Sequence, residues 1–249
     1  MKLKNRAKST TGKLLAATVI PAALAAANPA QATDFDQLLD LGQQQFEALV
    51  ENVGAVTHYK AIAPAEPLGI IGFDVALELS ATDIDGDIFD IASGGSIDES
   101  QFFLPRLHVH KGLPFGIDLG ASLAVVPTTD IIALGAELRY AFLKGSIITP
   151  AVAARVHYSV IQGVDELDVD NSGVELTISK GFLMFTPYAG IGAIRTSGSA
   201  NGVAGLNDES VNQEKVYVGL NINLGFNFGV EADRTGDFNT FSIKAGLRF

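Results

Sequence analysis

The chain has 249 residues and a formal net charge of −11, which argues against a nucleic-acid binder because such proteins meet phosphates with a basic face. It has no cysteine, which excludes disulfide frameworks and Cys-ligated metal centres. Its 47% hydrophobic and 18% charged residues exclude a disordered chain, yet the body of the sequence lacks the run of about 18 apolar residues that a transmembrane helix needs.

The first 32 residues have the pattern of a secretory signal peptide. Basic residues from Lys2 to Lys13 precede an apolar run over 14–27, and Ala30 and Ala32 form a small-x-small cleavage site. We therefore expect export and cleavage after Ala32. The alternative is an amphipathic membrane anchor that remains attached to the protein.

A helix is predicted over 34–56, because apolar residues from Phe35 to Val53 recur at intervals of three, four and seven. Asp34 can cap its first turn. An extended linker should follow over 57–67, since Pro64 and Pro67 each disfavour helix at the residue before them.

After Pro67 the hydrophobic pattern changes to a period of two, which indicates strands. Several of these segments reach ten or more residues, whereas strands of soluble proteins average about five or six and those that cross a bilayer need about 9–11. The ten predicted strands are 68–82, 101–111, 114–126, 130–143, 147–161, 172–182, 184–196, 213–224, 226–234 and 238–249. The pattern predicts an all-β fold, a closed antiparallel transmembrane β-barrel of about ten strands with a short N-terminal helix. A soluble secreted β-sandwich is the rival, but it does not explain the long strands.

The connections between the predicted strands alternate in length. Those after the second, fourth, sixth and eighth strands are tight turns, whereas 83–100, 162–171 and 197–212 are long and polar. The other two odd-numbered connections, near 127–129 and 235–237, are also short, so long loops occur only on one side. Outer-membrane barrels have short periplasmic turns and longer external loops, so both ends of the barrel should lie on the periplasmic side. Phenylalanines near the tight turns fit an aromatic girdle at that interface.

The C-terminal segment Lys-Ala-Gly-Leu-Arg-Phe, with Phe249 last, resembles the final strand of Gram-negative outer-membrane barrels. The segment 186–193 is similar to a strand opening in several small barrels of this class. The resemblance implies a place in the bacterial outer membrane, with outer-membrane lipid as a partner. It also implies that the barrel-assembly machinery reads Phe249 as its signal. The expected organisation is a signal peptide (1–32), a helix with its linker (33–67) and a barrel (68–249).

Alternation assigns sixteen ionisable side chains to the lumen. A ten-stranded barrel is nearly filled by side chains, so its charges need partners, and the near balance of acids and bases fits internal salt bridges. The residues are Asp74, Glu78, Arg106, His108, His110, Asp118, Glu137, Arg139, Arg155, His157, Glu175, Lys215, Glu231, Asp233, Lys244 and Arg248.

Two functions from different classes remain open. The first is a non-catalytic barrel that serves envelope structure, or the passage or binding of a small solute. The second is an outer-membrane enzyme, a hydrolase or acyltransferase, in which a histidine would act as a base. Strand positions place His108 and His110 near the periplasmic end and His157 near the external rim, and no Gly-x-Ser-x-Gly motif occurs. No catalytic residue is therefore assigned, and no cofactor is expected.

Two further features bear on these alternatives. Asp83, Asp85 and Asp87 are weak candidates for a cation site, but their spacing is not that of an EF-hand, and we interpret them as a solvated loop. The helix over 34–56 can stay outside the barrel or enter it. Wall glycines would leave room for such a plug, although they can equally serve to let the wall curve, and we expect partial occlusion near the periplasmic mouth. These glycines are Gly116, Gly120, Gly135, Gly190 and Gly192.

Overall fold

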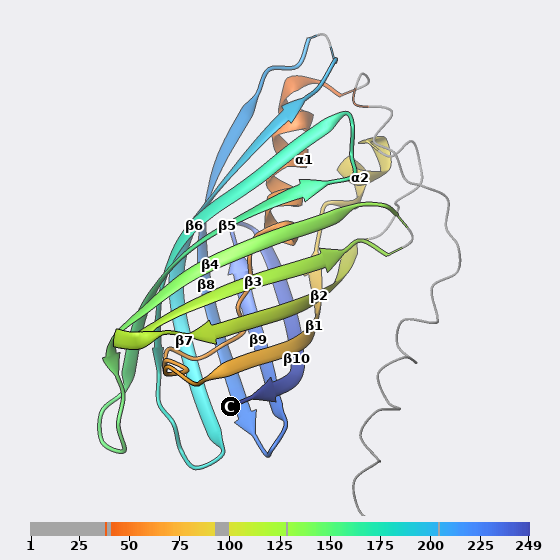
Figure 1. Cartoon of the computed structure of the whole chain (residues 1–249). Helices are drawn as coiled ribbons and strands as arrows, with labels where there is room; N and C mark the ends of the chain where they lie inside the picture. The colour runs from red at the N-terminus through yellow and green to blue at the C-terminus, as the bar shows by residue number, and fades with distance from the viewer. Residues whose placement is uncertain (1–37, 39–40, 93–99, 128, 204) are drawn as a thin grey trace, which may run out of the picture.

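The computed structural model describes residues 38, 41–92, 100–127, 129–203 and 205–249, so the predicted signal peptide lies outside the described residues. Ten antiparallel strands form a closed barrel in the order β1-β10-β9-β8-β7-β6-β5-β4-β3-β2 (Figure 1), which confirms the predicted fold class. The strands are β1 (Phe73–Asp83), β2 (Gln101–Gly112), β3 (Ile117–Val125), β4 (Ile132–Lys144), β5 (Ala151–Gln162), β6 (Leu167–Ser179), β7 (Phe185–Ala200), β8 (Glu209–Asn223), β9 (Asn227–Thr235) and β10 (Phe238–Arg248). The described helices are α1 (Gln43–Thr57), α2 (Gly86–Ala92) and the short 3-10 helix η2 (Pro114–Gly116).

The outer wall of the barrel is apolar. Large hydrophobic side chains point away from the barrel on every strand, which a water-soluble monomer would not expose over such an area. They include Leu77, Leu107, Leu119, Leu138, Val156, Leu176, Ile191, Val218, Phe228 and Ile243. No described helix is long and apolar enough to cross a membrane. The outward side chains of the strands form an apolar surface of the kind that faces lipid in transmembrane barrels.

β1 and β10 close the barrel in register, from Asp74 opposite Arg248 to Thr82 opposite Thr240. Phe249 continues the pairing, because its backbone exchanges two hydrogen bonds with Phe73, of 3.1 and 2.9 Å. The rings of Phe73 and Phe249 stack with centroids 6.3 Å apart. The C-terminal residue is thus part of the closing seam.

Three strands extend further than the sequence predicts. β6 begins at Leu167, β7 ends at Ala200 and β8 begins at Glu209, so much of the segments predicted as the loops 162–171 and 197–212 is strand. The outward side chains there are polar, as at Asp168 and Ser197, whereas the inward Leu167 and Val169 are buried. These strand ends were predicted as loops because their outward side chains are polar. A strand that extends beyond the lipid has a polar outer face, so its sequence resembles that of a loop.

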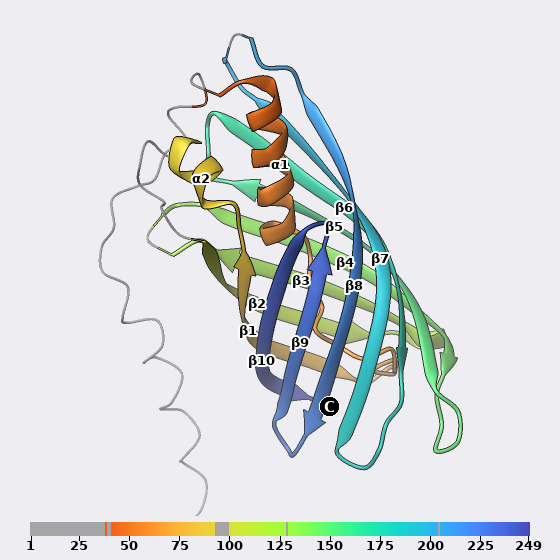
Figure 2. The ribbon, with the colours of Figure 1, turned by 180° about the vertical axis from the view of Figure 1, so that it is seen from behind.

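One end of the barrel carries the long β1–β2 (84–100) and β7–β8 (201–208) connections and is here called the long-loop mouth; the other end is the short-turn mouth. Helix α1 lies at the long-loop mouth, beside α2 and against the ends of β6, β7 and β8 (Figures 1 and 2). Its apolar side packs into a core with these strand ends, and the close contact of Val50 with Gly198 leaves no room for a larger residue there. The core residues of α1 are Phe46, Leu49, Val50, Val53 and Val56. The predicted position near the short-turn mouth is therefore wrong.

The helix also starts later than predicted. Leu41 and Gly42 are not helical, and Gly42 is the N-cap, with its N–H donating to the Gln45 side chain at 2.9 Å. A glycine inside a helix costs about 1 kcal/mol relative to alanine, so it favours a boundary at this position. The apolar spacing N-terminal to Gly42 suggested one continuous helix, and Asp34 and Phe35, where that helix was expected to begin, lie outside the described residues.

Candidate functional site

The barrel lumen contains part of the chain's own N-terminal region. Residues 58–66, here called the lumen segment, run from the end of α1 through the barrel toward the start of β1 (Figure 1). Tyr59, Lys60 and Ile62 are at most 1% exposed, and every residue from 58 to 65 is buried. The stretch predicted as a linker is extended as expected, but it occupies the interior of the barrel.

Barrel side chains hold the lumen segment by its backbone. Arg139 donates to the Pro64 carbonyl at 2.7 Å, Arg248 to the Glu66 carbonyl at 3.2 Å, and Arg106 to the His58 carbonyl at 3.3 Å. Each of these cations also pairs with a wall carboxylate. The backbone carbonyls of the segment therefore accept hydrogen bonds from guanidinium N–H groups that the salt bridges do not use, and buried polar groups need such partners.

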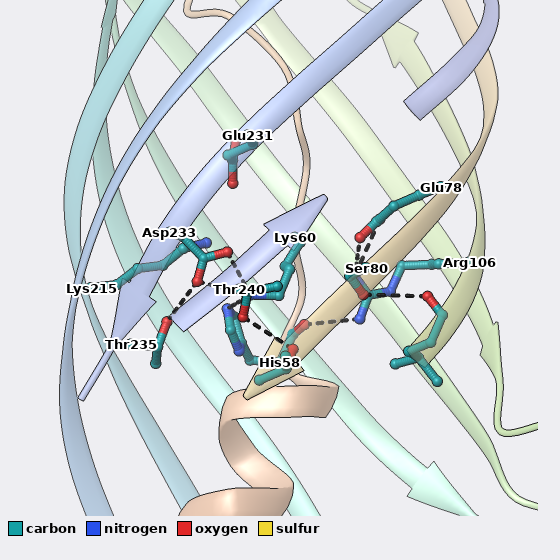
Figure 3. Close-up of polar contacts among 12 residues, drawn as sticks. His58, Lys60, Glu78, Ser80, Arg106, Lys215, Glu231, Asp233, Thr235 and Thr240 are labelled. Carbon is teal, nitrogen blue, oxygen red and sulfur yellow. Dashed lines mark hydrogen bonds and ion pairs between the residues drawn. The ribbon is translucent and has the colours of Figure 1, made fainter. Parts of the chain in front are cut away.

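Lys60 forms a buried ion pair between the segment and the wall. Its Nζ lies 2.7 and 3.0 Å from the two carboxylate oxygens of Asp233 and 3.4 Å from the Thr240 hydroxyl (Figure 3). The ring of His58 is 3.2 Å away. Both partners of the Lys60–Asp233 pair have fully buried side chains, so the pair replaces the solvation that each charge loses.

Tyr59 fits against two glycines of the wall. A Cβ on Gly120 or Gly135 would come within 2.7 Å of a Tyr59 side-chain atom, so only glycine leaves room for this ring. The Tyr59 hydroxyl is 3.0 Å from His110 Nε2, and the ring stacks on that of His157 with centroids 5.9 Å apart. The predicted room at Gly120 and Gly135 is thus used by the lumen segment, whereas Gly190 faces Tyr217 and Gly192 faces Glu175.

The ionisable residues expected in the lumen form paired groups inside the barrel. Fifteen of the sixteen are at most 5% exposed, and the Arg248 side chain, near the short-turn mouth, is 12% exposed. Glu78 pairs with Arg106 and His108, Asp118 with Arg139, Glu137 with Arg155 and His110, Glu175 with Arg155, Lys215 and His157, and Asp74 with Lys244 and Arg248. Asp233 pairs with Lys60, and Glu231 accepts a hydrogen bond from Tyr188 at 2.9 Å.

The expectation that the histidines lie far apart is wrong. His110 is opposite Gly120, Gly120 is opposite Glu137, and Glu137 is opposite His157, so the pairs form one row across β2 to β5. His110 and His157 both contact Tyr59. Strands in a barrel are tilted and staggered, so the distance of a residue from its turn does not give its height in the membrane.

Several polar residues of the interior were not among the sequence candidates. Tyr217 donates to or accepts from Thr177 at 2.6 Å and lies under the Lys215 ammonium, while Thr196 donates to Asn171 at 2.7 Å. Asn171 in turn contacts the Thr57 hydroxyl at the end of α1. Their alternate positions on the strands indicate lumen-facing side chains in the same way as those of the charged residues and histidines.

The three histidines of the barrel wall lie among carboxylates and the ring of Tyr59. In the described part of the chain, no serine or threonine hydroxyl is hydrogen-bonded to His108, His110 or His157, whose contacts are to carboxylates and Tyr59. A substrate would also need to displace the lumen segment to reach them.

The acidic residues at the end of β1 also have local structural contacts. Asp83 accepts a hydrogen bond from the Gln101 side chain, the Asp85 backbone N–H donates to Asn52 of α1, and Asp87 is in the first turn of α2. Within the described ranges, no group of three or more metal-binding side chains is placed to hold an ion. Asp83 thus links β1 to β2, and Asp85 links the start of α2 to α1.

No family model matches the sequence, and no curated protein does either. Solved structures similar in architecture are outer-membrane barrels of Gram-negative bacteria. The KdgM porin in complex with oligogalacturonate has 11% identity and a TM-score of 0.37, covering 71% of this chain and 99% of that one. The β-domain of the Bordetella autotransporter BrkA has 14% identity and a TM-score of 0.42, covering 72% and 98%. The N-terminal domain of Pseudomonas aeruginosa OprF has 9% identity and a TM-score of 0.35, covering 71% and 97%.

Proposed function

We propose that this protein is an integral outer-membrane barrel with a non-catalytic role in envelope structure, and that its own N-terminal region seals it against free passage of solutes. The observation that carries this is the lumen segment, which is buried along the barrel axis and bonded to the wall from His58 to Glu66. Helix α1 adds a second obstruction at the long-loop mouth.

The membrane placement rests on the apolar outer wall and on the length of the strands. By the usual arrangement of such barrels, the short turns face the periplasm and the long connections face outward. The predicted signal peptide would bring the chain across the inner membrane, and outer-membrane lipid and the assembly machinery are the partners that this placement requires.

The enzyme alternative has one observation in its favour, the row of His110, Glu137 and His157 with Tyr59 over it. A histidine beside a carboxylate can act as a base. However, His110 and Arg155 both pair with Glu137, and His157 pairs with Glu175. The buried lumen segment covers these groups. We interpret them as the polar filling of a sealed barrel.

Conductance in planar bilayers tests the seal. The purified protein should give little current, and deletion of residues 34–56 should change this little, because the lumen segment remains in place. Deletion of residues 34–66 should raise the conductance, since it removes the chain that fills the interior. Each protein must first show the heat-modifiable gel mobility of a folded barrel. Open-pore currents from the intact protein, or rapid sugar uptake into liposomes that contain it, would refute the proposed seal.

A second test concerns Phe249. Removing this residue deletes two backbone hydrogen bonds at the seam, the stacking on Phe73 and the predicted assembly signal. We expect much less folded protein in the outer membrane, measured as the heat-modifiable band in membrane fractions. Phe249→Tyr, which keeps an aromatic end, serves as the control. If the truncated chain accumulates as well as the intact one, Phe249 has no part in assembly.

A further inference from the structure

The two ends of the lumen segment lie at opposite mouths of the barrel. Just before the segment, Thr57 bonds to Ser159 and Asn171, near the β5–β6 connection (163–166) and at the same mouth as the long β1–β2 and β7–β8 connections. Just after the segment, the Leu68 N–H donates to Asp118, close to the turn between β2 and β3 at the short-turn mouth. The chain therefore enters β1 from the short-turn mouth only after it has passed through the whole lumen.

Helix α1 is bound at the long-loop mouth by elements far apart in the sequence. The Gln43 side chain bonds to Asn207 and Glu209 at the start of β8, and Asn52 accepts from the Asp85 backbone before α2. Gly54 packs so closely on Thr196 of β7 that any larger residue would collide with it. These contacts add to the apolar core, so α1 is an integrated part of this mouth.

From this path we infer that the N-terminal end of α1 is displayed on the outer surface of the cell, in a cap formed by α1, α2 and the extended ends of β6, β7 and β8. The inference rests on the proposed membrane placement, in which the long connections face outward. It adds a property to the barrel, because the first turn of α1 would be exposed to the exterior, at the mouth opposite to the one where the chain enters β1.

One flank of α1 is open to solvent in this cap. β9 ends at Thr235, opposite Lys215, so the part of β8 before Lys215 rises above the β9–β10 hairpin. Figure 2 shows α1 above the end of this hairpin. Gln44 and Glu47 are exposed on α1, and Asp237 at the tip of the hairpin has a side chain that is 90% exposed. External reagents should reach these positions if the inference is correct.

Single cysteines test this topology cleanly, because the natural chain has none. We would express Gln44→Cys and Glu47→Cys and label intact cells with a small membrane-impermeant maleimide. Both variants should react at the same rate in intact cells and in cells with a permeabilised outer membrane. Ile147→Cys, in the connection between β4 and β5 at the opposite mouth and 97% exposed, should react only after permeabilisation. Asp237→Cys should react in intact cells and reports the orientation of the barrel independently of α1.

The outcomes separate the two proposals. Labelling of Asp237→Cys without labelling of Gln44→Cys and Glu47→Cys in intact cells would overturn the display of α1 and leave the barrel orientation intact. Labelling of Ile147→Cys in intact cells, with protection of Asp237→Cys, would show that the barrel is reversed. It would overturn both the proposed membrane orientation and the display of α1. Recovery of the folded protein outside the outer-membrane fraction would do the same. Leu49→Cys, buried in the α1 core, should stay unlabelled in every folded sample and controls for local opening.

Discussion

Replacing Asp233 with asparagine is expected to lower the free energy of unfolding by about 3–5 kcal/mol, the usual cost of removing one partner of a buried ion pair. The Lys60 ammonium would stay buried, 2.7 Å from a neutral amide instead of a carboxylate. Urea unfolding in lipid vesicles, followed by tyrosine fluorescence and gel mobility, measures the change. Because Lys60 belongs to the lumen segment, the same variant should loosen the seal and raise the frequency of channel openings.

Two control variants make this test specific. The double variant Lys60→Met and Asp233→Leu removes both charges and should recover most of the lost stability, since apolar residues can replace a buried pair at little cost. Asp237→Asn breaks the exposed pair with Arg234 in the adjacent turn and should leave the unfolding midpoint nearly unchanged. If Asp233→Asn were as mild as Asp237→Asn, the lumen segment would not be held by this ion pair.

Leu138→Arg is expected to cost about 2–4 kcal/mol, the range for a basic residue on the lipid face near the bilayer midplane. Leu138 lies in the middle of β4, opposite Leu119 and Val156, and its side chain points outward with 47% exposure. The guanidinium would have to leave the hydrocarbon or draw water into it. Equilibrium unfolding in vesicles measures the difference from the natural protein.

The depth of the substitution provides the control. Val125 points outward at the long-loop end of β3, so Val125→Arg should cost only about 0–1 kcal/mol, as expected near the interface. Equal effects at positions 125 and 138 would mean that lipid does not surround this wall as proposed. A harmless Leu138→Arg would mean that the facing of β4 is inverted, because a shift of one residue turns every side chain to the other side.

The sequence was sufficient for the number of strands, their antiparallel order and the facing of their side chains. Neighbouring residues such as Glu137 and Leu138 show why: the pleat turns successive side chains to opposite faces, so the alternation is a local property. The pairing of acids and bases in the lumen was expected on the same basis, since a low-dielectric interior requires it.

The tertiary structure decided what fills the barrel and which residues meet there. The row of His110, Glu137 and His157 depends on the stagger of four strands, and stagger is a relation between strands that no single strand encodes.

The lumen segment depends on the closed wall in the same way. Lys60 and Tyr59 look like residues of an exposed linker until the wall supplies Asp233 and the space over Gly120 and Gly135. A local pattern thus determined the wall of this protein, whereas the path of the N-terminal region through it required contacts between residues more than 170 positions apart, such as Lys60 and Asp233.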